Sequence, residues 1–125
     1  MKRLVAALLF IAVALGSSLG CYFLTVERTV RLSDTLEKEK SIFMQAGKPD
    51  VDRAEKISKE WENHEELLVA MLPHDELEEI EIDIMKLTAC AEQNVPDEYL
   101  EALNDCINRL NHIRDTEEFA WRNIF

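Results

Sequence analysis

The feature that most constrains this chain is an uninterrupted apolar stretch close to its N-terminus. Residues 4–26 contain no charged side chain, whereas charged residues make up 31% of the 125-residue chain. As a helix, this stretch reaches about 34 Å, enough to cross the hydrocarbon core of a bilayer. A helix also satisfies its own backbone hydrogen bonds in lipid. We therefore predict that residues 1–26 form a membrane anchor and residues 27–125 form a separate domain.

The flanking charges indicate an orientation. Lys2 and Arg3 are the only charged residues before Glu27. Basic residues next to a spanning helix tend to stay on the cytoplasmic side. We expect a single-pass protein of the cell membrane, with its N-terminus in the cytoplasm and its C-terminal domain outside the cytoplasm. The first expected partner is therefore the lipid bilayer.

Two alternatives start from the same residues. A secretory signal cleaved after residues 12–14 or after residues 18–20 would leave an apolar new N-terminus, which disfavours it. A lipoprotein would use residues 18–21 as its lipobox and carry its lipid on Cys21, although Ser18 stands where an apolar residue is usual. The retained helix is favoured, and all three alternatives place the rest of the chain outside the cytoplasm.

Small residues form one face of the apolar stretch. Ala12, Gly16 and Gly20 follow one another at four-residue steps. This spacing lets two membrane helices approach closely, which makes self-association a hypothesis. Signal-like segments are also often rich in Gly, Ser and Ala, and this second explanation is favoured.

Composition predicts an acidic, all-α domain after the anchor. All 25 acidic residues fall at or after Glu27, and the whole chain has a formal net charge of −11. Such a surface repels nucleic-acid phosphates, so we exclude nucleic-acid binding as a main function. Gly and Pro occur only three times each, as is typical of helices.

Four helical stretches are predicted, at about residues 27–45, 50–72, 75–93 and 97–121 or beyond, and the first continues from the membrane helix. Within them, apolar residues recur at three- and four-residue steps. Short connections force consecutive helices to be antiparallel neighbours. The expected fold is an antiparallel four-helix bundle; the alternative is a three-helix bundle on a membrane-emergent stalk.

Caps are predicted at the breaks between these stretches. Gly47 suits the end of the first helix, and Asp50 can cap the second. Pro73 ends the second helix, and Asp75 with Glu78 three residues later predicts a cap for the third.

The predicted topology brings the turn at Pro73 and the C-terminus to the membrane-proximal end. Phe119, Trp121 and Phe125 would then lie near the lipid headgroups, where aromatic rings are favoured. The alternative is that these three rings only close the end of the bundle.

No catalytic or metal-binding pattern is found in the sequence. None of His64, His74 and His112 has a Glu three positions before it, as a di-iron bundle requires. Phosphate-binding glycine loops, zinc-protease motifs and nucleophile elbows are also missing from the sequence. We therefore expect no enzyme, no cofactor and no bound metal. Cys90 and Cys106 are expected to be offset by about 9 Å on antiparallel helices, and so to remain free, buried thiols.

A long acidic stretch lies between Lys59 and Lys86, with ten acidic residues and no basic one. It is a candidate for holding Ca²⁺ or for docking a basic partner. A continuous helix, however, spreads its carboxylates around the cylinder. A solvated acidic face is therefore favoured.

Several segments of the chain resemble one family. Trp61, residues 72–80, residues 110–113, Glu117 and residues 123–125 resemble the pattern of the bacterial domain of unknown function 4363 family. The resemblance implies a single N-terminal membrane helix followed by about a hundred helical residues. It also implies a Gram-positive origin, and partnership with a multi-pass membrane protein, but no activity.

The chain departs from that pattern in three places. Pro73, Arg114 and Phe125 stand where an acid, a proline and a leucine are common in the family. These departures concern local turn geometry only.

Residues of the family pattern gather at one end of the predicted bundle. His74 and Asp75 begin the third helix, while His112, Glu117 and Asn123 lie in the second half of the fourth. They form either a structural lock between helices or a contact surface, and the structural explanation is favoured.

These observations favour an interaction or structural module held at the outer face of the membrane. It would bind another membrane protein or a second copy of itself. The alternative is a helical bundle that senses a ligand or a divalent cation through the acidic stretch.

Overall fold

The computed structural model describes the backbone of residues 1–124 and all their side chains except those of Ala120, Trp121 and Ile124. It contains four helices: α1 (Lys2–Ala46), α2 (Val51–Leu68), α3 (His74–Gln93) and α4 (Pro96–Ile124). Residues 1–124 contain no strand. The predicted all-α class is therefore confirmed.

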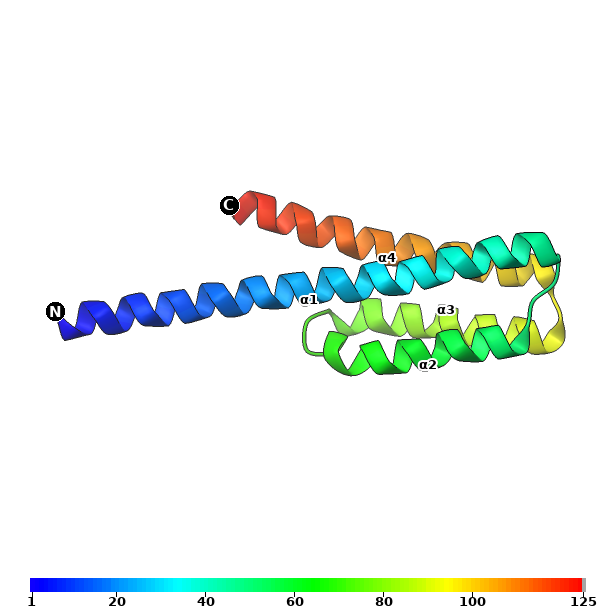
Figure 1. The fold of residues 1–125 in the computed structure, drawn as a ribbon, viewed down its shortest axis with the longest axis horizontal. Helices are drawn as coiled ribbons and strands as arrows, with labels where there is room; N and C mark the ends of the chain where they lie inside the picture. Colours follow the sequence, from blue (N-terminus) through cyan, green and yellow to red (C-terminus); the bar gives the residue numbers. More distant parts are fainter. Residues whose placement is uncertain (125) are drawn as a thin grey trace.

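The helices form an antiparallel four-helix bundle (Figure 1). α1 lies beside α2 and α4, and α3 lies beside α2 and α4, so the four helices close into a square. The second half of α1 contributes Leu32, Leu36 and Phe43 to the core. α1 is thus a full member of the bundle, and the alternative of a three-helix bundle on a stalk is set aside.

α1 continues without a break from the apolar stretch into the bundle. It has 45 residues and a length of about 68 Å. Residues 1–21 are all exposed and project beyond the other three helices (Figure 1). By length and composition, α1 is apolar and long enough to cross a membrane.

The core follows the predicted apolar periodicity. Trp61 and Tyr99 are the largest of its fully buried side chains. Between them, the aliphatic residues of the four helices form one continuous cluster: Leu32, Leu36, Ala54, Ile57, Leu68, Leu72, Leu77, Ile80, Ile84, Leu87, Ala91, Ala102, Leu103, Ile107, Leu110 and Ile113. Burial of these stripes, at about 25 cal/mol per Å² of apolar surface, is the main force that holds the helices together.

The connection between α1 and α2 forms as predicted. Gly47 ends α1 with φ 75°, a left-handed conformation that favours glycine, and its N–H donates to the Phe43 carbonyl at 2.8 Å. The Asp50 carboxylate accepts from the N–H of Asp52 at 2.8 Å and of Arg53 at 3.3 Å. Asp50 therefore caps α2.

The connection between α2 and α3 differs from the prediction. α2 ends at Leu68, not Leu72, because the Leu68 carbonyl accepts from the N–H groups of both Met71 and Leu72, which closes a turn. Pro73 disfavours helical backbone at the residue before it. The predicted cap at Asp75 is also wrong: Pro73 holds the cap position, no side chain caps α3, and Asp75 lies within the first turn.

Cys90 and Cys106 are both buried and both free, as expected from the register of α3 and α4. Burial raises the pKa of the Cys106 thiol to about 12. This cysteine therefore behaves as a small apolar side chain of the core.

Candidate functional site

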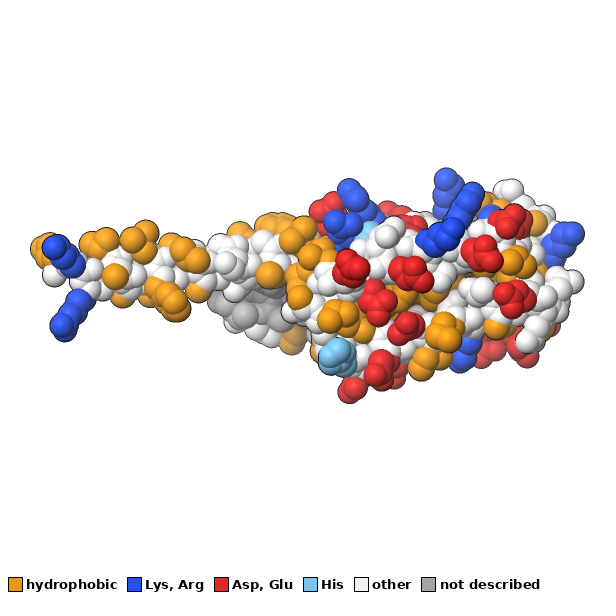
Figure 2. Space-filling model, turned by 90° about the horizontal axis from the view of Figure 1, so that it is seen from below, with side chains coloured by type: hydrophobic (Ala, Val, Ile, Leu, Met, Phe, Trp, Pro, Cys, Tyr) orange, Lys and Arg blue, Asp and Glu red, His pale blue; other side chains and the backbone are white. Residues whose placement is uncertain are grey.

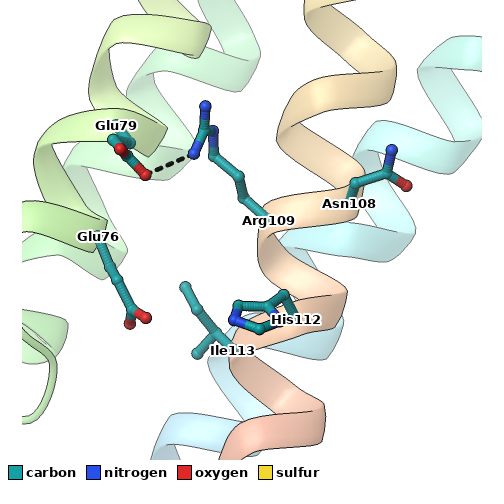
Figure 3. A pocket seen from close by; sticks show the side chains of 6 residues that line it. All are labelled: Glu76, Glu79, Asn108, Arg109, His112 and Ile113. Carbon is teal, nitrogen blue, oxygen red and sulfur yellow. Dashed lines mark hydrogen bonds and ion pairs between the residues drawn. The ribbon is translucent and has the colours of Figure 1, made fainter.

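A cleft opens between α3 and α4 in the half of the bundle next to the projecting part of α1 (Figure 1). It encloses about 420 Å³. Its lining residues, drawn in Figure 3, are Glu76, Glu79, Asn108, Arg109, His112 and Ile113. They come from successive turns of the two helices, so the cleft is a groove along a helix–helix seam.

An ion-pair network closes one end of the cleft, the upper end in Figure 3. Arg109 Nε donates to Asp83 Oδ2 at 2.7 Å, and Arg109 Nη1 donates to Glu79. The Asp83 side chain is only 3% exposed, whereas that of Arg109 is 40% exposed. The hydrogen bond to Asp83 raises the pKa of Arg109. The arginine charge is thus used to satisfy a buried carboxylate.

Two carboxylates, Glu76 and Glu117, repel each other electrostatically near the other end of the cleft. Partial burial raises the pKa of Glu117 on α4, and the negative charge of Glu76 on α3 raises it further. His112 is exposed, and in Figure 3 Ile113 lies between it and Glu76. This end of the cleft therefore has an excess of negative charge.

The arrangement suits the binding of a cationic group. Glu76 offers acceptors to a cationic or hydrogen-bond-donating group, and Ile113 offers an apolar wall. A ligand of matching chemistry would be a basic side chain of another protein.

The structure brings together part of the predicted cluster. His112 lies in the cleft and Glu117 beside Glu76, while His74 and Asp75 are exposed in the first turn of α3. Asn123 is also exposed, close to the end of α4. Within residues 1–124, no side-chain hydrogen bond or ion pair links these five residues. Whether they act as a lock or as a contact surface stays a prediction.

The predicted acidic face is solvated with one exception, Asp83, which is buried against Arg109. Sequence reasoning missed this residue because it counted Asp83 with its acidic neighbours. The signal was nevertheless present: Asp83 stands three residues after Ile80 and four before Leu87, at a core position of the helical pattern.

Glu39 is a second buried acid that sequence reasoning missed. Its carboxylate accepts from the Tyr99 hydroxyl at 2.9 Å and from Arg53 Nε at 2.9 Å. Desolvation and the charge of Glu39 raise the pKa of Tyr99, so its hydroxyl stays a donor. This network joins α1, α2 and α4 at the end of the bundle far from the apolar stretch.

His64 is a third polar residue at a core position. It is buried on α2, with Nδ1 3.3 Å from Arg28 Nη1 on α1 and Nε2 3.6 Å from Glu60 Oε1. Of the histidines, His64 is therefore the one held inside the fold.

Among the described residues, no group of three or more His, Cys, Asp or Glu side chains lies close enough to hold a metal ion. The membrane-helix face predicted to pack is open: a Cβ added at Gly16 or Gly20 would meet nothing within 4 Å. Ala12 and Cys21 are exposed on the same helix.

Comparisons with known proteins give one match. The model of a family described as "Domain of unknown function (DUF4363)" matches residues 29–124. The search of curated proteins and the search of solved structures return no match.

Proposed function

We propose, from the premise that this chain belongs to the DUF4363 family, that it is a membrane-anchored interaction module. α1 would cross the membrane once, and the four-helix bundle would be held outside the cytoplasm to bind another membrane protein or a second copy of the chain. Membership by itself implies no activity, so the proposal depends on the geometry of α1 and of the cleft.

The exposure of the first half of α1 carries the proposal. Large apolar side chains there face away from the bundle, among them Leu4, Leu9 and Phe10, which are all more than half exposed. Water-soluble proteins rarely leave a contiguous apolar surface of more than a few hundred Å² uncovered. A bilayer would cover this segment along its whole length.

The lipoprotein alternative differs only in the anchor. Acylation of Cys21 with removal of residues 1–20 would take away exposed residues and leave the bundle core intact. The mass of the mature protein distinguishes the alternatives: the full chain mass supports a retained helix, whereas a shortened, lipid-bearing chain overturns it in favour of the lipoprotein.

The orientation of the chain in the membrane is tested by labelling single introduced cysteines. Lys48 is exposed in the α1–α2 connection, at the end of the bundle far from α1's apolar stretch. A Lys48→Cys variant in a Cys21→Ser background should react with a membrane-impermeant maleimide on intact cells. Reaction only after permeabilisation would contradict an extracytoplasmic bundle. A matched Lys2→Cys variant should show the opposite behaviour.

The interaction role is supported by the acidic cleft between α3 and α4. A photo-crosslinking amino acid at His112, in the cleft, should give a defined adduct in native membranes. The same group at Glu55, an exposed position on α2, is the control. An adduct that is equally strong at both positions, or at neither, would count against the cleft as the contact surface.

A divalent-cation sensor is the second candidate. The charge of Glu76 on α3 raises the pKa of Glu117 on α4 after desolvation, and the pKa of Glu65 on α2 is raised by desolvation and then by the charge of Glu81 on α3. A cation would relieve this repulsion. Calorimetry with Ca²⁺ on the detergent-solubilised chain tests it, because saturable heat at micromolar concentration supports the sensor and its absence removes it.

A further inference from the structure

The register of α4 against α1 fixes the height at which α4 ends. The Ser33 hydroxyl donates to the side-chain oxygen of Asn111 at 3.4 Å, so these two residues are level on antiparallel helices. Six residues further along α4 is Glu117, and six residues back along α1 is Glu27. Both helices rise by about 1.5 Å per residue, so Glu117 is level with Glu27. The last turns of α4 therefore lie at the height of the charge-free stretch of α1, from which they diverge toward the C-terminus (Figure 1).

The turn between α2 and α3 reaches the same height. Thr25 Oγ1 donates to Met71 Sδ at 3.1 Å, which ties the turn to the end of the charge-free stretch. Residues 67–73 around this turn carry no charged side chain, and residues 119–124 at the end of α4 carry only Arg122. In three separate segments, the acidic residues thus end near one common level.

Large apolar side chains are exposed just below that level. They are Phe23 (60% exposed) and Leu24 (40%) on α1, Val69 (46%) in the turn and Phe119 (66%) on α4. We name these four residues the bundle base. In Figure 2 the acidic side chains cover the bundle, and none is visible on the projecting part of α1.

We infer that the bundle base is seated in the interfacial layer of the bilayer, so that its partner is a lipid surface. The inference rests on α1 being the membrane anchor, as proposed above. The base adjoins the exposed apolar surface of α1, and a bilayer that covers this surface up to Val26 also meets Phe119 and Val69.

The side chains of this region suit the headgroup layer. Aromatic rings such as those of Phe23 and Phe119 are favoured at the membrane interface. Arg122 is exposed, and its long stem allows the guanidinium to reach lipid phosphates. Glu27 and Glu117 stay on the aqueous side of the common level. A partner protein that covered the bundle base in place of lipid would have to enclose a helix that is already inserted in the bilayer.

Tryptophan quenching by brominated lipids tests the inference. The full-length protein carries Trp121→Phe, which leaves Trp61 as a core reference, and is reconstituted in phosphatidylcholine vesicles with bromines at a shallow acyl position. A new tryptophan is placed by Phe119→Trp at the base, by Leu9→Trp inside the span, or by Met85→Trp on the exposed face of α3. A fourth variant, Val69→Trp, gives a second measurement at the base.

The expected result is that Leu9→Trp, Phe119→Trp and Val69→Trp lose at least half of their added fluorescence, while Met85→Trp loses none. Quenching at Leu9 without quenching at positions 119 and 69 overturns the seated base and leaves the anchor in place. Failure to quench Leu9→Trp overturns the anchor, and the inference with it. A circular dichroism spectrum and melting temperature equal to those of the Trp121→Phe parent confirm that each variant keeps its fold.

Discussion

Three of the buried polar side chains each lie beside an arginine of a neighbouring helix. Glu39 pairs with Arg53, Asp83 pairs with Arg109, and His64 lies against Arg28. A buried charge that has lost its partner is costly, so any register that separates these pairs is disfavoured. Their role in this fold, by hypothesis, is to select one alignment of the four helices.

The cost of separating one pair can be measured. Arg109→Ala should lower the free energy of unfolding by about 2 kcal/mol, because it leaves Asp83 buried without a donor. Arg114→Ala is the control, since Arg114 lies 3.9 Å from the exposed Asp115 and should contribute less than about 0.5 kcal/mol. Chemical denaturation in detergent measures both. If both variants lost the same unfolding free energy, the buried Arg109–Asp83 pair would contribute no more to stability than an exposed pair.

Glu117 should make stability depend on pH. Its pKa in the folded chain is raised, so the ionised carboxylate is disfavoured and its contribution to stability is lost as pH rises through that pKa. Glu117→Gln should therefore raise the melting temperature at pH 7, by an amount equivalent to about 0.5 kcal/mol, and give no gain at pH 4. The exposed Glu55→Gln should show no such difference between the two pH values. A gain at pH 4 as large as at pH 7 would contradict repulsion as the cause.

Residue-scale features were only partly predictable from the sequence. The core position of Asp83 or Glu39 can be seen as a break in an apolar period. The hydrogen-bond partner of a buried acid cannot be found from the apolar period. Glu39 and Tyr99, for example, are 60 residues apart and meet only once the helices are aligned. His112 and Glu117 were predicted to share one end of the bundle, because the topology alone places them there. Glu76 and Arg109 were not recognised as their neighbours, because contacts between α3 and α4 depend on how the two helices are aligned.

At the scale of the elements, caps that use only local chemistry were predictable. Gly47 and Asp50 act within a few residues of their own positions, and both do what the sequence indicates. The end of α2 was not predictable to the residue, because residues 69–72 form a turn in which Val69 is exposed and Leu72 is buried. The apolar period alone cannot distinguish such a turn from helix.

The cap of α2 gives an element-scale prediction. Asp50→Ala should destabilise the bundle by about 1 kcal/mol, because the N–H groups of Asp52 and Arg53 lose their acceptor. Asp50→Asn keeps a side-chain oxygen and should recover most of the loss. Thermal melts followed by circular dichroism compare the two. If Asn were as harmful as Ala, the ion pair of Asp50 with Arg53 would account for the effect instead.

At the scale of the whole molecule, the antiparallel topology was predictable from the sequence, but the number of helices in the bundle was not. Three short connections require antiparallel neighbours, and four apolar stripes require a common core. The sequence could not choose between four helices and three on a stalk, because α1 continues from the apolar stretch into the bundle with no breaker. The burial of Leu32, Leu36 and Phe43 settles that choice.

Self-association is the whole-molecule prediction that follows from the open face of α1. If Ala12, Gly16 and Gly20 bring two copies together, the double variant Gly16→Leu and Gly20→Leu should reduce the dimer signal in a membrane two-hybrid assay at least fivefold. A matched Leu8→Ile and Leu15→Ile variant should leave the signal unchanged. A dimer that survives both leucines would exclude this face as the contact.

The unbroken course of α1 has a mechanical consequence. A helix without a proline, a Gly/Ser pair or a bulge resists bending, and α1 has none of these from Cys21 to Ala46, across the boundary between the apolar stretch and the bundle. If the first half is held in lipid, Gly47 stands about 30 Å beyond Glu27. Any tilt or rotation of the embedded half then turns the acidic cleft by the same angle, so the bilayer determines both how far the cleft reaches and in which direction it points.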